Sequence, residues 1–302
     1  MSSRRVVAVV GATASGKSAL ALDLAERLGG EIVNTDSMQV YRGMDIGTAK
    51  LPLAERRGIA HHLVDVLEVS EPATVAEFQV WAREVVADCH ARDVVPVLVG
   101  GSPLYTRGVL DEFEFPGTDP VVRARLEGEL AELGAEALHQ RLAEVDPLAA
   151  SRVLPSNGRR VVRALEVVEI TGRPFSAMLP ELSYHYPGAV QVGVDIVRDL
   201  LDERIARRVD VMWELGLVEE VRGLLPRGLR EGRTASRALG YQQVLAFLDG
   251  ELTEDEARER TVVGTRRFAR RQMSWNRADP RIRWVSHDDE QLVESALAAI
   301  TS

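Results

Sequence analysis

Residues 5–18 read RVVAVVGATASGKS, and this stretch decides the fold class. The apolar run Arg5–Val10 predicts a buried strand of a parallel sheet. Gly11–Ser18 then fits the pattern G-x-x-x-x-G-K-[ST], and Ser18–Leu28 continues with helical apolar spacing. A strand, a glycine-rich turn and a helix in this order predict a phosphate-binding loop (P-loop) at the edge of an α/β sheet.

The chemistry of this loop follows from its residue types. Backbone N–H groups wrap a phosphate, and the helix N-terminus adds partial positive charge. Lys17 is expected to reach the phosphate as a point charge, and the Ser18 hydroxyl is expected to ligate Mg²⁺. Only Lys17 and Lys50 are lysines among 37 basic residues, so a lysine here marks a position that needs a compact ammonium. The residues expected to hold a di- or triphosphate are Gly11, Ala12, Thr13, Ala14, Ser15, Gly16, Lys17 and Ser18.

The rest of the chain predicts a P-loop parallel sheet with helices on both faces, interrupted by an all-helical insertion. Further strands are expected at Glu31–Val33, Val94–Val99, Val190–Ile196 and Ile282–Val285. Helices are expected at Thr74–Ala91, Pro120–Leu133, Ala135–Val145 and Asn157–Ile170, and again up to Ala278. The predicted core is therefore residues 1–118 and 189–302, and the predicted insertion is residues 119–188.

Composition sets the broad class. The chain has 302 residues, 45% of them hydrophobic and 27% charged, which is typical of a folded globular protein of about two domains. The sequence contains no apolar run of about 18 residues, so no membrane span is expected. No secretory signal is expected at the N-terminus. Cys89 is the only cysteine, so an intramolecular disulfide is excluded and a cytoplasmic location is expected.

Two strand ends carry further information about the chemistry. Asp36 follows the second expected strand, where ligands bind in open α/β sheets, and it is a candidate to accept a proton or to hold a metal through water. A turn-capping role for Asp36 is an equal alternative. The next strand ends in Gly100, Gly101 and Ser102, without the carboxylate that motor-type NTPases place on Mg²⁺. This pattern favours a group-transfer enzyme, either a P-loop kinase or an enzyme whose leaving group is a diphosphate.

Six ordered motifs resemble the tRNA dimethylallyltransferase family, also called tRNA isopentenyltransferases, in its bacterial form. They are GATASGKS (11–18), NTDSMQVYRGMDIGTAK (34–50), LVGGSPLY (98–105), NGRRVVRALE (157–166), RALGYQQ (237–243) and RRFARRQMSW (266–275). The resemblance runs collinearly from about residue 6 to about residue 285. It implies transfer of a dimethylallyl group from dimethylallyl diphosphate to N6 of adenosine 37, which is 3′-adjacent to the anticodon, in tRNAs that read UNN codons. It also implies a requirement for Mg²⁺.

The same resemblance assigns roles to individual residues. It implies that Asp36 is the general base and that Lys17, Ser102 and Arg237 complete the catalytic set. Ser102 stands where the family usually has threonine, and the hydroxyl is kept. Residues implied to contact the tRNA anticodon stem-loop are Asp36, Ser37, Met38, Gln39, Ser102, Arg123, Arg159, Arg160, Arg163 and Arg237. From their charge or their place in the motifs, Tyr241, Gln242, Arg266 and Arg270 are also expected to contact the tRNA.

Charge is distributed unevenly along the chain. The formal net charge is −9, which taken alone argues against a nucleic-acid partner. The segment 256–283 nevertheless contains nine arginines against three acidic residues, and its helical spacing predicts that Arg266, Arg267, Arg270 and Arg271 share one side of a helix. A basic helix side of this kind fits RNA phosphates, with a solvated helix face as the alternative.

Aromatic and histidine residues carry weaker signals. Tyr105 and Tyr241 lie beside motif residues and are candidates to stack on a base. His61 and His62 are expected to be structural, because no further metal ligands are spaced nearby in the sequence. We expect a monomer. A small-molecule kinase and a non-catalytic RNA-binding protein are the competing functions, and the motif leaves open whether ATP also enters the loop.

Overall fold

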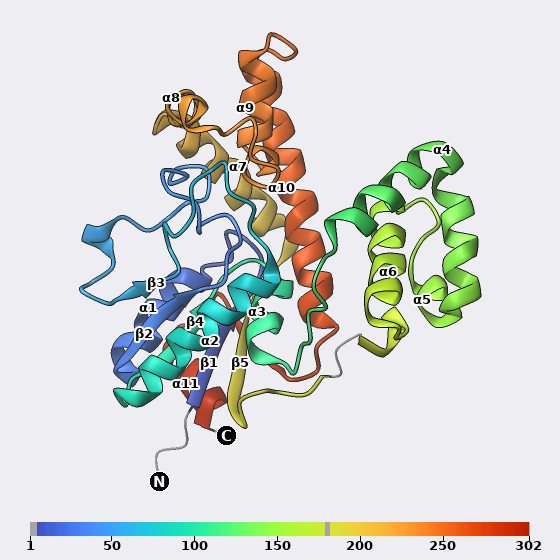
Figure 1. Cartoon of the computed structure of the whole chain (residues 1–302). Helices are drawn as coiled ribbons and strands as arrows, with labels where there is room; N and C mark the ends of the chain where they lie inside the picture. The colour runs from blue at the N-terminus through green and yellow to red at the C-terminus, as the bar shows by residue number, and fades with distance from the viewer. Residues whose placement is uncertain (1–4, 179–181, 302) are drawn as a thin grey trace. The chain divides into compact units, whose positions relative to one another are not determined.

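The structure is a computed structural model that describes residues 5–178 and 182–301. Contacts between Cα atoms divide the chain into two compact units, Met1–Leu110 with Tyr184–Ser302, and Asp111–Ser183. The first unit contains a sheet covered by helices, and the described part of the second unit contains helices and no strand (Figure 1). Among the described residues, no helix is long and apolar enough to cross a lipid bilayer.

The sheet of the first unit confirms the predicted fold class. Its six strands are all parallel and lie in the order β3-β2-β4-β1-β5-β6. Their bounds are β1 Arg5–Val10, β2 Gly30–Asn34, β3 His61–His62, β4 Val95–Val99, β5 Gly188–Asp195 and β6 Ile282–Ser286. The central strand β1 pairs with β4 on one side and β5 on the other, so it is buried on both faces.

Helices cover the two faces of the sheet because side chains alternate along β1. Val7 and Val9 pack in a core with α1 (Lys17–Leu28) and α11 (Leu292–Thr301). Val6, Ala8 and Val10 pack in a second core that includes Phe78 and Val86 of α2 (Val75–Ala91). Each fully buried aliphatic side chain contributes about 1.5–3 kcal/mol to the free energy of folding.

The remaining α-helices of the first unit follow β4 or β5 in the chain. They are α3 (Pro103–Leu110), α7 (Arg198–Glu214), α8 (Leu217–Leu224), α9 (Tyr241–Leu248) and α10 (Glu254–Arg277). Helix α10 is the long helix that contacts α7 and α9 (Figure 1). Its N-terminus is fixed by a capping box, in which Thr253 and Glu256 satisfy each other's backbone N–H groups.

The second unit is a helical bundle with its own core. It contains α4 (Pro120–Val145), α5 (Pro147–Arg152), α6 (Gly158–Thr171) and the 3₁₀ segment Phe175–Met178. Asp119 caps α4 by accepting hydrogen bonds from the N–H groups of Val121 and Val122, as the Asp-Pro start signal predicted. Gly134 is non-helical (φ 82°), so α4 is two helical pieces that meet where the sequence predicted a break.

Several elements differ from the sequence-based expectations. The structure divides the chain at 110/111 and 183/184, earlier than the predicted boundaries at 118/119 and 188/189. Tyr184 belongs to the sheet unit because its hydroxyl accepts a hydrogen bond from Gln191 in β5 (3.0 Å) and the Arg281 guanidinium lies 4.1 Å from its ring centroid. The sequence analysis missed β3, α3, α5 and α11, which are short or follow turns that carry no strong periodicity.

Candidate active site

The P-loop connects β1 to α1 and has the backbone of an anion-binding turn. Ala14 (φ 64°) and Gly16 (φ 98°) are in the left-handed region, which turns successive N–H groups toward one concave side. Gly16 is the N-cap of α1 and offers no side-chain acceptor, so the first N–H groups of the helix have no side-chain cap. The Ser15 hydroxyl is buried and has no hydrogen-bond partner among the described residues. A bound phosphate oxygen would satisfy these donors.

Lys17 is the buried cation of this loop. Its Nζ donates to the Ala12 carbonyl at 3.2 Å, and its side chain is almost fully out of solvent. Burial and, to a smaller extent, the nearby Arg208 guanidinium lower the pKa of Lys17 to about 8, against the opposing effect of the Asp36 carboxylate. Arg208 and Asp36 are therefore close enough to act on the charge of Lys17, although the three residues come from α7, the end of β2 and α1.

Asp36 is held in a turn just after β2. The Asn34 side chain accepts from the Asp36 N–H (2.8 Å) and donates to the Asp36 carbonyl (3.1 Å), while Asp36 Oδ1 accepts from the Met38 N–H (2.9 Å). Asp36 thus makes the turn that the alternative interpretation predicted, and its side chain also lines a cavity of this unit. A Cβ at Gly101 would lie 3.3 Å from Asp36 Oδ2, so the glycine leaves room beside that oxygen.

Two residues from distant segments fix the surroundings of Asp36. The Ser102 hydroxyl donates to the Ser37 hydroxyl (3.0 Å) and accepts from the Ser37 N–H (3.2 Å). Gln272 of α10 accepts from the N–H of Thr13 (2.9 Å) and donates to the Gly101 carbonyl. The P-loop, the end of β4 and α10 are therefore joined by one buried side-chain amide.

A cavity of about 360 Å³ lies at this edge of the sheet. It brings together seven of the predicted site residues, which are Thr13, Asp36, Ser37, Met38, Ser102, Arg237 and Gln242. Its wall also contains Arg271 of the predicted basic helix side, and it is completed by residues that the sequence did not single out, among them Gly47, Thr48, Arg208, Thr265 and Phe268. Arg208 is the most consequential of these, because it is a partly buried cation that lowers the pKa of Lys17 and whose own pKa, lowered by burial, is raised by the Asp36 carboxylate. Nothing in the arginine-rich sequence of α7 distinguished it.

Other predicted site residues lie outside this cavity. Ser18 is exposed and lines a separate hollow of about 70 Å³ with Asn34 and Gln39. The Gln39 side chain donates to the Thr48 carbonyl at 3.0 Å. Tyr241 is fully buried and Tyr105 is packed against Phe78, so the prediction that either one stacks on a base is wrong. Both aromatic rings are used for packing instead.

The arginines of α10 lie on two sides of the helix, and the prediction of a single basic side is wrong. Arg266 and Arg270 line a cavity of about 380 Å³ beside the ends of β5 and β6, together with Arg198 and Arg277. Arg267 and Arg271 line a shallow groove with Arg260 near α9. The reason is geometric, because positions i and i+4 share a side of a helix whereas i and i+1 do not.

The predicted arginines of the second unit serve two different purposes. Glu166 is fully buried, and both Arg123 and Arg163 pair with it, which lowers its pKa against the opposing effect of burial. Arg163 also donates to the carbonyls of Pro116 and Gly117 (2.5 and 3.0 Å). Arg159 and Arg160 are exposed on α6. Two of these four arginines are thus committed to the unit's own structure.

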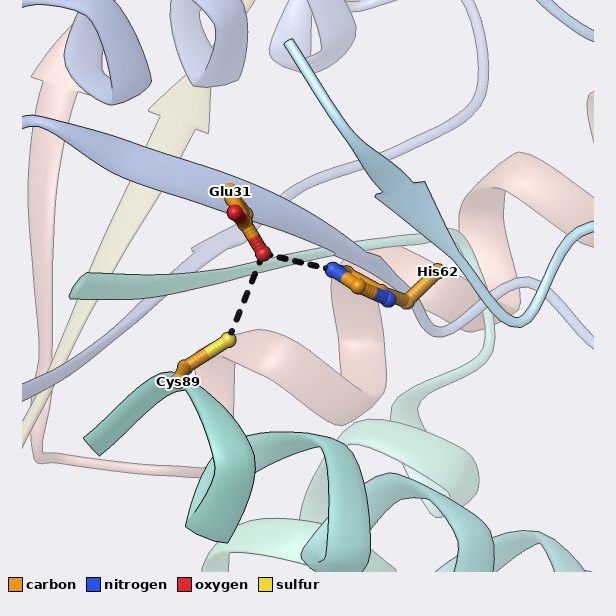
Figure 2. Close-up of side chains that lie close together, drawn as sticks. All are labelled: Glu31, His62 and Cys89. Carbon is orange, nitrogen blue, oxygen red and sulfur yellow. Dashed lines mark hydrogen bonds and ion pairs between the residues drawn. The ribbon is translucent and has the colours of Figure 1, made fainter. Parts of the chain in front are cut away.

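Figure 2 shows a cluster that the sequence analysis did not foresee, since Glu31 and Cys89 approach His62 in space. Glu31 pairs with His62 (2.7 Å), and its two oxygens each accept a hydrogen bond from the Arg92 guanidinium (2.7 Å each). These contacts hold the pKa of Glu31 at about 2, and burial raises the pKa of the Cys89 thiol to about 11. A protonated thiol and a carboxylate already paired with arginine make a poor metal site, so we interpret the cluster as structural.

Comparison with known proteins identifies the family. A family model described as IPP transferase matches residues 39–279. The chain belongs to the IPP transferase family. It is 66% identical over 297 residues to the tRNA dimethylallyltransferase of a Nocardioides species, and this alignment covers 98% of this chain and 96% of that protein. It is 62% identical over 300 residues to the tRNA dimethylallyltransferase of Thermobifida fusca, with 98% and 94% covered.

Solved structures of IPP transferases match the fold. The crystal structure of the full-length tRNA isopentenylpyrophosphate transferase from Bacillus halodurans has a TM-score of 0.72 and 39% identity, covering 99% of this chain and 95% of that one. A eukaryotic dimethylallyltransferase captured acting on tRNA has a TM-score of 0.84 and 26% identity, covering 99% and 79%. The family resemblance read from the six motifs is therefore confirmed.

Proposed function

We propose that this protein transfers the dimethylallyl group of dimethylallyl diphosphate to N6 of adenosine 37 in tRNAs that read UNN codons, with release of diphosphate. The observation that supports this most strongly is the charge arrangement at the cavity of about 360 Å³. Asp36 and Arg208 line this cavity, and the charges of both act on the buried ammonium of Lys17. A proton acceptor beside an anion-binding site is what this displacement requires.

The P-loop is the proposed site for the diphosphate of the donor. When the allylic C1–O bond breaks, its electron pair goes to the diphosphate, and negative charge grows on the leaving oxygens. Lys17, Arg208, the loop N–H groups and the unpartnered Ser15 hydroxyl are already in place to stabilise that charge. Arg237, which lines the same cavity, is proposed to assist. The Ser18 hydroxyl at the start of α1 is suited to Mg²⁺, which would supply further charge stabilisation for the leaving group.

Asp36 is proposed to take the proton from the attacking amino group. The N6 nitrogen bonds to C1 of the allyl group, and one of its protons passes to the free carboxylate oxygen of Asp36. Oδ1 of Asp36 is oriented by the Met38 N–H, so the carboxylate is held in one position for this transfer. A base that remained stacked in the anticodon loop would not reach this cavity, so the adenosine must be extruded into it.

The remaining cavity residues are proposed to contact the tRNA. Ser37, Met38, Ser102 and Gln242 line the same cavity as Asp36, and Arg271 lines both this cavity and the basic groove on α10. Exposed arginines at positions 159, 160, 267 and 270 are proposed to contact phosphates. We propose that the enzyme works in the cytoplasm as a monomer.

Mass analysis of tRNA nucleosides tests the proposal. Unmodified tRNA is incubated with the protein, Mg²⁺ and dimethylallyl diphosphate, and N6-dimethylallyladenosine is expected. Replacement of the donor by ATP serves as the control, and no modified nucleoside is expected from it. In parallel, thermal unfolding is measured with each compound. A Tm raised by ATP but not by dimethylallyl diphosphate, with no modified nucleoside formed, would favour the kinase alternative and contradict the proposal.

A further inference from the structure

One carboxylate holds three consecutive backbone amides at the wall of the cavity that contains Asp36. Glu220 of α8 accepts hydrogen bonds from the N–H groups of Asp45 (3.0 Å), Ile46 (2.7 Å) and Gly47 (3.3 Å). Gly47 and Thr48 line the cavity that also contains Asp36. Hydrogen bonds from N–H groups to an ionised carboxylate are about twice as strong as neutral ones, so this contact fixes the backbone of residues 45–47 firmly.

Tyr241 supports the same carboxylate from α9. Its hydroxyl donates to Glu220 Oε1, and burial beside Glu220 raises the pKa of Tyr241 well above 10, so the hydroxyl stays protonated and keeps donating. The Tyr241 ring lies directly against Gly47, where any Cβ would overlap it. The loop at 45–48 can therefore approach this ring only because residue 47 is glycine.

Lys50 also holds the loop at 45–48, from a position just after it in the chain. Its Nζ donates to Asp45 Oδ1 (2.7 Å), to Asp65 Oδ1 (2.5 Å) and to the Tyr41 carbonyl (2.6 Å). All three ammonium protons are used, which explains why a lysine stands here in a chain that otherwise uses arginine. The far end of the loop reaches the Asp36 turn, because the Thr48 carbonyl accepts from the Gln39 side chain (3.0 Å).

We infer that Glu220 is a positioning residue, which sets the Asp45–Thr48 loop as the cavity wall against which the extruded adenosine is placed. This inference rests on the proposed function. Among the described residues, the hydrogen bonds of Glu220 go to the backbone at 45–47 and to Tyr241, and none goes to the P-loop at 11–18. The loop that Glu220 holds connects to Gln39 and so to the turn that bears Asp36. Loss of the hydrogen bonds between Glu220 and residues 45–47 should therefore impair use of the tRNA and leave binding of the donor unchanged.

The test compares E220Q with E219Q. Glutamine keeps the size of the side chain but loses the charge, and it turns an NH₂ group toward backbone donors. Glu219 is the adjacent carboxylate, exposed and paired only with Arg222 among the described residues, so E219Q controls for loss of one negative charge on α8. We expect kcat/KM for tRNA to fall at least tenfold in E220Q, with the Kd for dimethylallyl diphosphate within threefold of wild type. E219Q should stay within twofold for both.

Hydrogen exchange gives a readout that does not depend on activity. The amides of Asp45, Ile46 and Gly47 should be protected in wild type and exchange at least tenfold faster in E220Q. Y241F, which removes one donor to Glu220 and leaves the three amides in place, should show a smaller loss of kcat/KM than E220Q. If E220Q does not fold, Y241F carries the test, with a twofold to tenfold loss expected.

The outcomes separate the two claims. Wild-type kcat/KM in E220Q would overturn the positioning role and leave the proposed function standing. A loss of donor affinity equal to the loss of kcat/KM would also overturn it, because Glu220 would then support the fold in general and not the tRNA side of the cavity alone. A wild-type protein that forms no modified nucleoside would overturn the proposed function, and the exchange rates would still show whether Glu220 holds the loop.

Discussion

The side chain of Gln272 accepts a hydrogen bond from the backbone N–H of Thr13 at 2.9 Å, although 259 residues separate them in the chain. The same side chain donates to the Gly101 carbonyl. A single amide thus satisfies an N–H of the P-loop and a carbonyl at the end of β4 while it anchors α10. Because the donor and acceptor ends of the amide are both used, α10, the P-loop and the end of β4 are held in fixed positions relative to one another.

Replacement of Gln272 by alanine should reduce both stability and activity. It leaves a buried N–H and a buried carbonyl without partners, which costs about 1–3 kcal/mol for each group left unsatisfied. We expect a lower denaturation midpoint in urea and at least a tenfold loss of kcat. Gln140→Ala, at an exposed position in the second unit, is the matched control and should change neither quantity measurably. An unchanged Tm and kcat in the Gln272 variant would show that the bridge is dispensable.

Replacement of Asp36 by asparagine should separate chemistry from binding. Asparagine keeps an oxygen that can accept from the Met38 N–H, so the turn should survive, but it cannot take a proton. We expect kcat to fall by about 10²–10⁴, the usual contribution of a general base, with the Kd for tRNA within threefold. Single-turnover kinetics together with filter binding measure the two quantities. A non-catalytic RNA-binding protein would instead retain its full biological activity in this variant.

Donor binding should depend on pH through Lys17. Burial lowers its pKa to about 8 in the free protein, and the charged form binds the diphosphate. Affinity should therefore be full below pH 8 and fall as the pH rises through 8, by up to tenfold per pH unit, since binding itself raises the pKa of Lys17. Isothermal titration between pH 7 and 9.5 checks this. Lys17→Ala should bind more weakly and without the bend near pH 8, whereas a flat wild-type profile contradicts the assignment.

The arginines predicted to contact RNA should divide into those that affect the salt dependence of tRNA binding and those that affect protein stability. Arg160→Ala and Arg270→Ala remove exposed charges, and each should reduce the slope of log K against log salt for tRNA by about 1 while leaving Tm unchanged. Arg123→Ala removes a partner of the buried Glu166 and should lower stability by about 1–3 kcal/mol. A slope unchanged in both exposed variants would remove these arginines from the RNA interface.

Glu31 should contribute to acid stability. Hydrogen bonds from Arg92 hold its pKa at about 2 in the folded protein, below the ordinary value of 4.5. Its contribution is therefore fully present above pH 4.5 and is lost as the pH falls from 4.5 toward 2. Urea unfolding across this range should show a shallower decline for Glu31→Gln than for wild type. Glu26→Gln, on the exposed surface of α1, is the control, and an identical pH dependence in all three proteins would contradict the prediction.

Sequence patterns predicted the elements whose signals are local. The P-loop, the strands around it and the capped helices follow from apolar periodicity and from turn and capping residues within about ten positions. Local patterns failed where a residue's partner lies far away in the chain. Tyr241 lies in a recognisable motif, yet its neighbours Glu220 and Gly47 come from other segments, and they turn an expected base-stacking residue into a buried support.

By itself the sequence determined that this chain builds a parallel P-loop sheet with an inserted helical unit, because a buried strand, a glycine-rich turn and a helix leave few other arrangements. It also determined the family, through six motifs in fixed order. Only the tertiary structure decided which charges meet. Arg208, Gln272 and Glu220 gain their roles from packing between segments remote in sequence, and no local pattern encodes the distance between two such side chains.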